Sequence, residues 1–202
     1  MLQLQGVSKA YGDVRALEPT DLHVPAGQTT VLLGPSGCGK STVLRLMIGL
    51  ERPDAGTVSF GGTVLAPANV LTLRRRMGYV IQEGGLFPHL TARRNVALMA
   101  RYLGWDAARI DARVRELAGL VQFPEERLDA FPAQLSGGQR QRVGLMRALV
   151  LDPDVLLLDE PLGALDALTR GALQAELARI WSLTGKTVVM ITNDVEEGIL
   201  LA

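Results

Sequence analysis

The most constraining feature of the chain is a glycine-rich loop, GPSGCGKST, at residues 34–42. Its three glycines permit a tight backbone curl in which successive N–H groups point at one anion. An apolar, β-branched run precedes the loop and a helical pattern follows it, so a helix N-terminus also faces the anion. Lys40 supplies positive charge to the terminal phosphates, and the Ser41 hydroxyl is a ligand for Mg²⁺. The loop predicts a nucleoside triphosphate site formed by Gly34, Pro35, Ser36, Gly37, Cys38, Gly39, Lys40, Ser41 and Thr42.

Composition excludes several other classes of protein. Lys plus Arg and Asp plus Glu both number 21, so the formal net charge is zero and offers no basic field for a nucleic-acid partner. No uninterrupted apolar run approaches the roughly 18 residues of a membrane span. Residues 1–10 contain no apolar secretory core, and the single cysteine, Cys38, has no partner for a disulfide. We therefore expect a soluble cytoplasmic domain that does not bind nucleic acid.

The hydrophobic pattern predicts an α/β fold. Continuous apolar strands alternate with helical segments, which is typical of a parallel sheet covered on both faces. Strands are expected at 2–5 (with edge-like alternation), 29–33, 57–60, 77–81, 155–159 and 187–192. Helices are expected at 42–50, over 91–120 as two helices separated by Gly104 and Asp106, at 137–151 and at 165–183. We predict one domain over 1–202, with a P-loop core on a mostly parallel sheet, an N-terminal antiparallel β portion and a helical lobe inserted at 84–151.

Two carboxylates end the strand predicted at 155–159, in the segment VLLLDE. In open α/β sheets, ligands bind at the carboxyl ends of the strands. We expect Asp159 to organise Mg²⁺ and Glu160 to polarise the attacking water. The alternative is a strand that merely ends in solvated acids, and the phosphate loop upstream favours the catalytic interpretation.

A second glycine motif, LSGGQRQR, lies at residues 135–142. Ser136, Gly137 and Gly138 open a helix and so form a second anion-binding corner. Together with the phosphate loop, this motif makes the chain resemble the ATP-binding cassette (ABC) ATPases over essentially its whole length. The resemblance implies that two subunits close head to tail around two ATP molecules. The corner, with Gln139, would then bind the γ-phosphate held by the partner subunit.

The resemblance assigns three further roles. Gln82 follows the strand predicted at 77–81, where the family has a glutamine that touches Mg²⁺ or the attacking water at the hinge of the helical lobe. Tyr11 would stack on adenine. The alternative to this role is a tyrosine that is merely exposed or packed at the edge of the sheet. Asp166 lies in a GALD segment that matches the loop crossing the dimer interface.

One position departs from the family pattern. After the strand predicted at 187–192, the family usually has a histidine that bonds the γ-phosphate, and this chain has Asn193. Asparagine keeps two neutral N–H donors, but it is shorter and does not titrate. The departure implies either slowed hydrolysis or a degenerate or engineered version of the chain. The sequence also ends at Ala202, where the family normally continues, so we expect a truncated chain.

The resemblance implies the ATPase subunit of a bacterial ABC importer, bound peripherally to the cytoplasmic side of the inner membrane. Its expected partners are a second ATPase subunit, expected to be a copy of itself, transmembrane permease subunits and, indirectly, a solute-binding protein. The segment GGLFPHLT at 84–91 would contact the permease or, alternatively, pack under the lobe.

Two segments, VIQEGGLFPHLT and GALDALTR, are similar to importers of osmoprotectants such as glycine betaine or choline. Nitrate, sulfonate, taurine and polyamine importers remain alternatives. Two hypotheses from other functional classes also remain: a non-transport cassette that acts on DNA or ribosomes, and a catalytically weak regulatory cassette.

Overall fold

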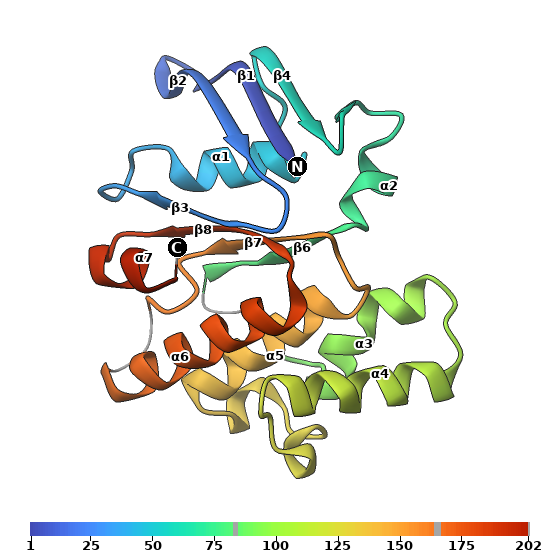
Figure 1. The fold of residues 1–202 in the computed structure, drawn as a ribbon. Coiled ribbons are helices and arrows are strands. Elements are labelled where there is room, and N and C mark those ends of the chain that lie inside the picture. Colours follow the sequence, from blue (N-terminus) through green and yellow to red (C-terminus); the bar gives the residue numbers. More distant parts are fainter. Residues whose placement is uncertain (83–84, 164–166, 202) are drawn as a thin grey trace.

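The computed structural model describes residues 1–82, 85–163 and 167–201. Two sheets lie one above the other, with helix α1 (Lys40–Met47) between them (Figure 1). The longer helices cover the opposite face of the lower sheet. This arrangement confirms the predicted α/β fold class.

The lower sheet is parallel, with strand order β3-β8-β7-β6. These strands are β3 (Thr29–Leu33), β6 (Met77–Val80), β7 (Val155–Asp159) and β8 (Thr187–Thr192). Alternate side chains of β7 enter different cores: Val155 and Leu157 join the cluster around α1, and Leu156 and Leu158 join the cluster around the helices below. Burial on both faces explains why this strand reads as a continuous apolar run.

The upper sheet is antiparallel, in the order β2-β1-β4-β5. Its strands are β1 (Leu2–Tyr11), β2 (Val14–Val24), β4 (Ala55–Phe60) and β5 (Thr63–Val64). The interpretation of residues 2–5 as a short edge strand was wrong, because β1 runs to Tyr11 and lies between β2 and β4. Register shifts interrupt its alternation after Leu4, which hid the rest of the strand from the sequence pattern.

The segment between β6 and β7 contains α3 (Ala92–Tyr102), α4 (Ala107–Leu120) and α5 (Gly137–Leu149), with short 3₁₀ turns at Glu125–Arg127 and Pro132–Gln134. We call α3, α4 and α5 the helical lobe. Thr91 and Asp106 cap α3 and α4, because their side chains accept bonds from the N–H groups of Arg94 and Arg109. Two helices therefore occur where the sequence predicted two.

The remaining helices are α2 (Val70–Arg74), α6 (Ala167–Thr184) and α7 (Val195–Leu201). The sequence pattern missed α2 and α7, which are too short to show helical periodicity. Helix α1 begins at Lys40 rather than at Thr42, and it ends before Gly49, whose φ of 69° stops the helix. Within the described ranges, no helix combines the length and apolarity that crossing a membrane requires.

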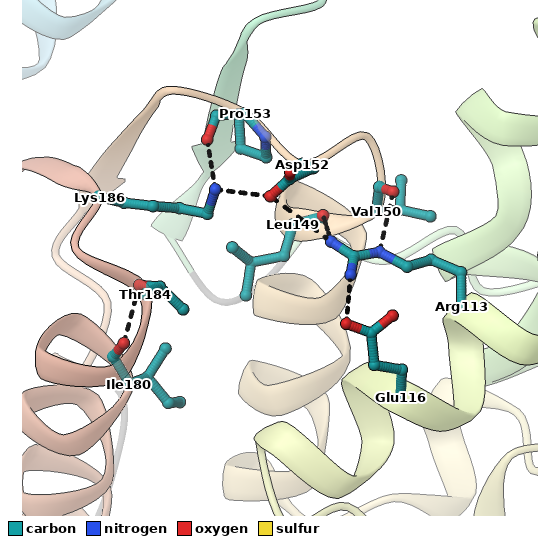
Figure 2. A network of polar contacts seen from close by, with 9 residues as sticks. All are labelled: Arg113, Glu116, Leu149, Val150, Asp152, Pro153, Ile180, Thr184 and Lys186. Carbon is teal, nitrogen blue, oxygen red and sulfur yellow. Dashed lines mark hydrogen bonds and ion pairs between the residues drawn. The ribbon is translucent and has the colours of Figure 1, made fainter.

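A polar network ties the helical lobe to the parallel sheet (Figure 2). Arg113 of α4 donates to the carbonyls of Leu149 (2.9 Å) and Val150 (3.3 Å), which caps the C-terminal end of α5. Lys186, just before β8, donates to the Asp152 carboxylate at 2.7 Å and to the Pro153 carbonyl at 2.8 Å. Asp152 thus lies between the Lys186 ammonium and the Arg113 guanidinium, the latter at 3.9 Å.

We expect Asp152→Asn to lower the free energy of unfolding slightly at pH 7. Asparagine accepts the left-handed backbone of this position (φ 55°), so the change isolates the loss of charge. The side chain is 75% exposed, and exposed ion pairs contribute about 0.2–1 kcal/mol. Urea denaturation would measure the difference.

The difference between Asp152→Asn and wild type should depend on pH. The hydrogen bond from Lys186 holds the pKa of the Asp152 carboxyl below its ordinary value of 3.8. The stabilisation is therefore complete above 3.8 and is lost as the pH falls through the lower folded-state pKa. A difference that stays constant from pH 7 down to pH 3 would contradict this role.

Candidate nucleotide-binding site

The phosphate loop joins β3 to α1, and its backbone requires glycine at two positions. Gly37 and Gly39 have φ values of 84° and 94°, in the region that favours glycine. A Cβ atom at Gly39 would lie 2.4 Å from the carbonyl oxygen of Ala16, so this glycine also allows β2 to approach the loop. Pro35, Ser36, Gly37 and Cys38 are exposed, as a ligand-contacting loop requires, whereas Thr42 is buried in the first turn of α1.

Lys40 is a buried cation at the centre of the loop. The residue is 8% exposed, and its ammonium donates to the carbonyls of Gly34 at 2.6 Å and Pro35 at 2.8 Å. Within the described part of the chain, none of its hydrogen bonds or ion pairs reaches a carboxylate. A buried charge without a counter-charge is unfavourable, so a phosphate anion at this loop fits the charge that the protein presents.

Ser41 and Asp159 form the second part of the loop site. The Ser41 hydroxyl donates to Oδ1 of Asp159 at 3.1 Å, and the Asp159 residue is 6% exposed. Hydroxyl and carboxylate oxygens are the hard ligands that Mg²⁺ prefers. Among the described residues, no three His, Cys, Asp or Glu side chains gather as a metal cage. A Mg²⁺ ion held by this pair would complete its shell with water and phosphate oxygens, as Mg²⁺ usually does.

Tyr79 is a site residue that the sequence interpretation missed. Its hydroxyl donates to Oδ2 of Asp159 at 3.2 Å and so orients the carboxylate that also bonds Ser41. Burial, together with the nearby Asp159 charge, raises the pKa of Tyr79 to about 12, which keeps the phenol protonated as a donor. The only sequence signal was its place in β6, and its meaning depended on the pairing of β6 with β7.

Glu160 follows β7 directly and has a left-handed backbone with φ 45°. For a residue other than glycine, this conformation costs about 1–2 kcal/mol and persists only where the surrounding structure enforces it. The Glu160 N–H donates to Ile191 at 3.0 Å, and the Glu160 carbonyl accepts from Gly163 at 3.2 Å. The Gln82 amide donates to Oε2 of Glu160 at 3.4 Å, so the structure brings together the two residues predicted to handle the attacking water.

Asn193 lies exposed in the turn between β8 and α7. Strand β8 pairs in parallel with β7, so this turn and Glu160 follow neighbouring strands at the same sheet edge. The turn is fixed by Asp194, which accepts from the N–H groups of Glu196 and Glu197, and by Thr192, which donates to the buried Glu197 at 2.6 Å. Burial raises the pKa of the Glu197 carboxyl.

Tyr11 lies on the β1–β2 hairpin beside the loop. It pairs with Val14 at the hairpin turn, and the nearby Ala16 carbonyl is the group that approaches Gly39. The tyrosine is 44% exposed, with the Lys9 ammonium 5.6 Å from the ring centre. An exposed ring on the hairpin whose second strand approaches Gly39 leaves a flat surface for a stacked base.

The predicted glycine corner, Ser136, Gly137 and Gly138, lies at the start of α5. Ser136 caps the helix, and its hydroxyl and backbone N–H exchange bonds with Gln139 at 3.2 and 3.0 Å. Gly137 and Gly138 occupy the first turn, whose N–H groups have no intrahelical partners. Among the described residues, no hydrogen bond or ion pair joins residues 136–139 to the loop at 34–42. Asp166 lies outside the described residues.

The family model described as ABC transporter matches residues 17–163, which include the loop, the glycine corner and Glu160. The glycine betaine uptake system ATP-binding protein YehX of Escherichia coli (strain K12) is 46% identical over 202 residues, covering 100% of this chain and 66% of that protein.

Two further curated relatives are named for the transport of different solutes. The glycine betaine/carnitine/choline transport ATP-binding protein OpuCA of Bacillus subtilis (strain 168) is 42% identical over 203 residues, or 100% of this chain and 53% of the relative. The sulfate/thiosulfate import ATP-binding protein CysA of Bordetella parapertussis (strain 12822) is 46% identical over 205 residues, or 100% and 57%. The chain therefore spans between about half and two thirds of the length of these relatives.

Among solved structures, the dimeric structure of MJ0796, described as a bacterial ABC transporter cassette, is similar over nearly the whole chain. The TM-score is 0.89 at 33% identity, with 99% of this chain and 91% of that chain covered.

We expect Gly39→Ala to destabilise the protein more than the matched change Gly37→Ala. Both positions have positive φ, which penalises alanine by about 1–2 kcal/mol. Only at Gly39 would the new Cβ meet backbone, and a forced displacement adds about 1–3 kcal/mol. Denaturant unfolding would measure both variants. Equal losses of unfolding free energy would contradict the close approach of β2 to the loop.

Proposed function

The chain belongs to the ABC transporter family, and from that premise we propose that it is the ATP-binding and ATP-hydrolysing subunit of a bacterial importer of a small solute. The observation that carries this proposal is the buried Lys40 ammonium, which lacks a carboxylate partner among the described residues and sits at the curled loop between β3 and α1. The contacts Ser41–Asp159 and Gln82–Glu160 at the adjoining sheet edge supply the groups for hydrolysis.

In this proposal, each side chain has a distinct task. Lys40 and the loop N–H groups bind the phosphates of ATP, with Ser41 and Asp159 holding Mg²⁺, which would neutralise charge on the phosphate oxygens. Glu160 accepts the proton of the water that attacks the γ-phosphorus, while the bond to the bridging oxygen breaks and ADP leaves. Gln82, already bonded to Glu160, orients that water. Tyr79 keeps Asp159 in place through its hydroxyl.

We propose that the active unit is a dimer, most simply of two copies of this chain. In the corner formed by Ser136, Gly137, Gly138 and Gln139, the N–H groups of the two glycines have no intrahelical partners, and no described hydrogen bond joins the corner to its own phosphate loop. A partner subunit that presents ATP to this corner would complete both parts of the site, and Asp166 would then contribute at the interface. A relative of known structure with the same fold, MJ0796, is a dimer.

For the solute, we propose a quaternary amine osmoprotectant such as glycine betaine or choline. The names of two curated relatives support this class. The sulfate/thiosulfate relative has the same identity as the glycine betaine relative, 46%, so identity within this chain does not select the solute. Nitrate, sulfonate, taurine and polyamines therefore remain alternative solutes, second to an osmoprotectant.

We further propose that a permease subunit docks in an apolar groove of about 500 Å³ between β6 and the helical lobe. Exposed apolar side chains line it, among them Leu71, Ile81, Phe87, Leu98, Met99 and Tyr102. Phe87 comes from the segment at 84–91 in which the sequence predicted the permease contact. A chain docked in this way would lie peripherally on the cytoplasmic side of the membrane.

The proposed hydrolysis is tested with Glu160→Gln. An amide does not accept the proton of water, so ATP turnover should fall by about 10²- to 10⁴-fold while ATP binding persists. The variant should accumulate as a dimer with Mg-ATP, which mass measurement in solution would detect. Lys40→Ala is the matched control, because it should lose ATP binding and with it the dimer. Normal turnover by Glu160→Gln would refute the assignment of the base.

The alternative of a catalytically weak regulatory cassette is supported by Asn193, which stands where the family usually has a histidine. We expect Asn193→His to raise ATP turnover about tenfold with little change in ATP affinity, because the longer imidazole adds a donor toward the charge that develops in the transition state. Steady-state turnover of the full-length protein would measure this. Unchanged turnover would mean that the native asparagine is already competent.

A further inference from the structure

Gln141 connects the glycine corner to the loop that carries Glu160. The residue lies on α5 and is 7% exposed, and its side-chain amide donates to the carbonyl of Pro161. Helix α5 begins at the glycine corner, whereas Pro161 immediately follows Glu160. One buried hydrogen bond therefore joins the helix of one anion corner to the backbone beside the proposed base.

This bond adds to the restraints on a strained backbone. The left-handed conformation of Glu160 is held from the sheet by Ile191 and from within its own loop by Gly163. Gln141 supplies the restraint that comes from the helical lobe. A proline has no N–H, so the Pro161 carbonyl is the only backbone group through which this residue can be held by a hydrogen bond.

The surrounding packing leaves little room to absorb a movement of α5. Arg142, which follows Gln141 in the chain, forms an ion pair with Glu176 of α6 at 2.6 Å. The Glu176 side chain is only 6% exposed. The space enclosed by these residues with Pro161 and Leu162 amounts to only about 10 Å³. Densely packed interiors transmit displacements rather than dissipating them.

We propose that Gln141 is a positioning residue that couples the glycine corner of a subunit to Glu160 of the same subunit. This inference rests on the proposed function. In the dimer, the corner receives the nucleotide held by the partner, whereas Glu160 acts on the nucleotide of its own subunit. Gln141 thus links the two sites, and occupancy of one site sets the position of the base in the other.

The test is Gln141→Met in the full-length dimeric protein, with Gln141→Glu as a second variant of the same size should Met fold poorly. ATP binding should stay within about twofold, because no loop residue is changed. The maximal turnover should fall at least tenfold, and the Hill coefficient for ATP should fall toward one. Val143→Ala is the matched control, because it loosens the packing of the same helix without removing the bond to Pro161.

An unchanged maximal turnover and Hill coefficient in Gln141→Met, or equal losses in Val143→Ala, would overturn the coupling. A wild-type protein that does not hydrolyse ATP would overturn the proposed function as well, so the two failures are distinguishable. Mixed dimers sharpen the test. Gln141→Met should be tolerated in the subunit that also carries Glu160→Gln, and should lower the remaining turnover at least tenfold when placed in the other subunit. Equal turnover of the two arrangements would contradict action within one subunit.

Discussion

The burial of β7 on both faces is the constraint on which the site depends. Its four apolar residues, 155–158, are all 0–1% exposed, and each buried aliphatic side chain contributes about 1.5–3 kcal/mol. Because total stabilities are about 5–15 kcal/mol, losing this burial would unfold the protein, so the register of the strand is fixed. That register brings Asp159 and Glu160 to the edge where β3, β6 and β8 also end. The parallel arrangement thus gathers residues that are distant in sequence.

The same edge carries several unfavourable features. Lys40 is a buried cation held by carbonyls, Asp159 is a buried carboxylate held by two hydroxyls, and Glu160 has a left-handed backbone. Each is retained because the surrounding core enforces it. An arriving phosphate and cation would supply the counter-charges of Lys40 and Asp159 respectively. A site that is already organised in this way needs little rearrangement when its ligand binds.

Local signals allowed much of this to be predicted from the sequence. The strand before the phosphate loop and the two helices predicted over 91–120 depend on nearby residues, and they lie where the pattern indicated. The place of β1 inside its sheet was not predictable, because it depends on pairing with β4 some fifty residues away. Tyr79 on Asp159 has the same origin, since it requires knowing that β6 and β7 are neighbours. The assigned roles of the site residues remain proposals.

Because the glycine corner and the phosphate loop are separate sites, helix α5 provides a physical link between the glycine corner and the loop that carries Glu160. Gln141 follows Gly137 by four residues, or about 6 Å along the helix axis at the usual rise. Over so short a distance a helix moves nearly as a rigid body, so a displacement at its first turn would also move the Gln141 side chain that bonds Pro161. Among the backbone restraints named above, the bond from Gln141 is the one that originates in the lobe, so it is the one that a partner's nucleotide could shift. Closure of a dimer would therefore act on the base through geometry already present in one subunit.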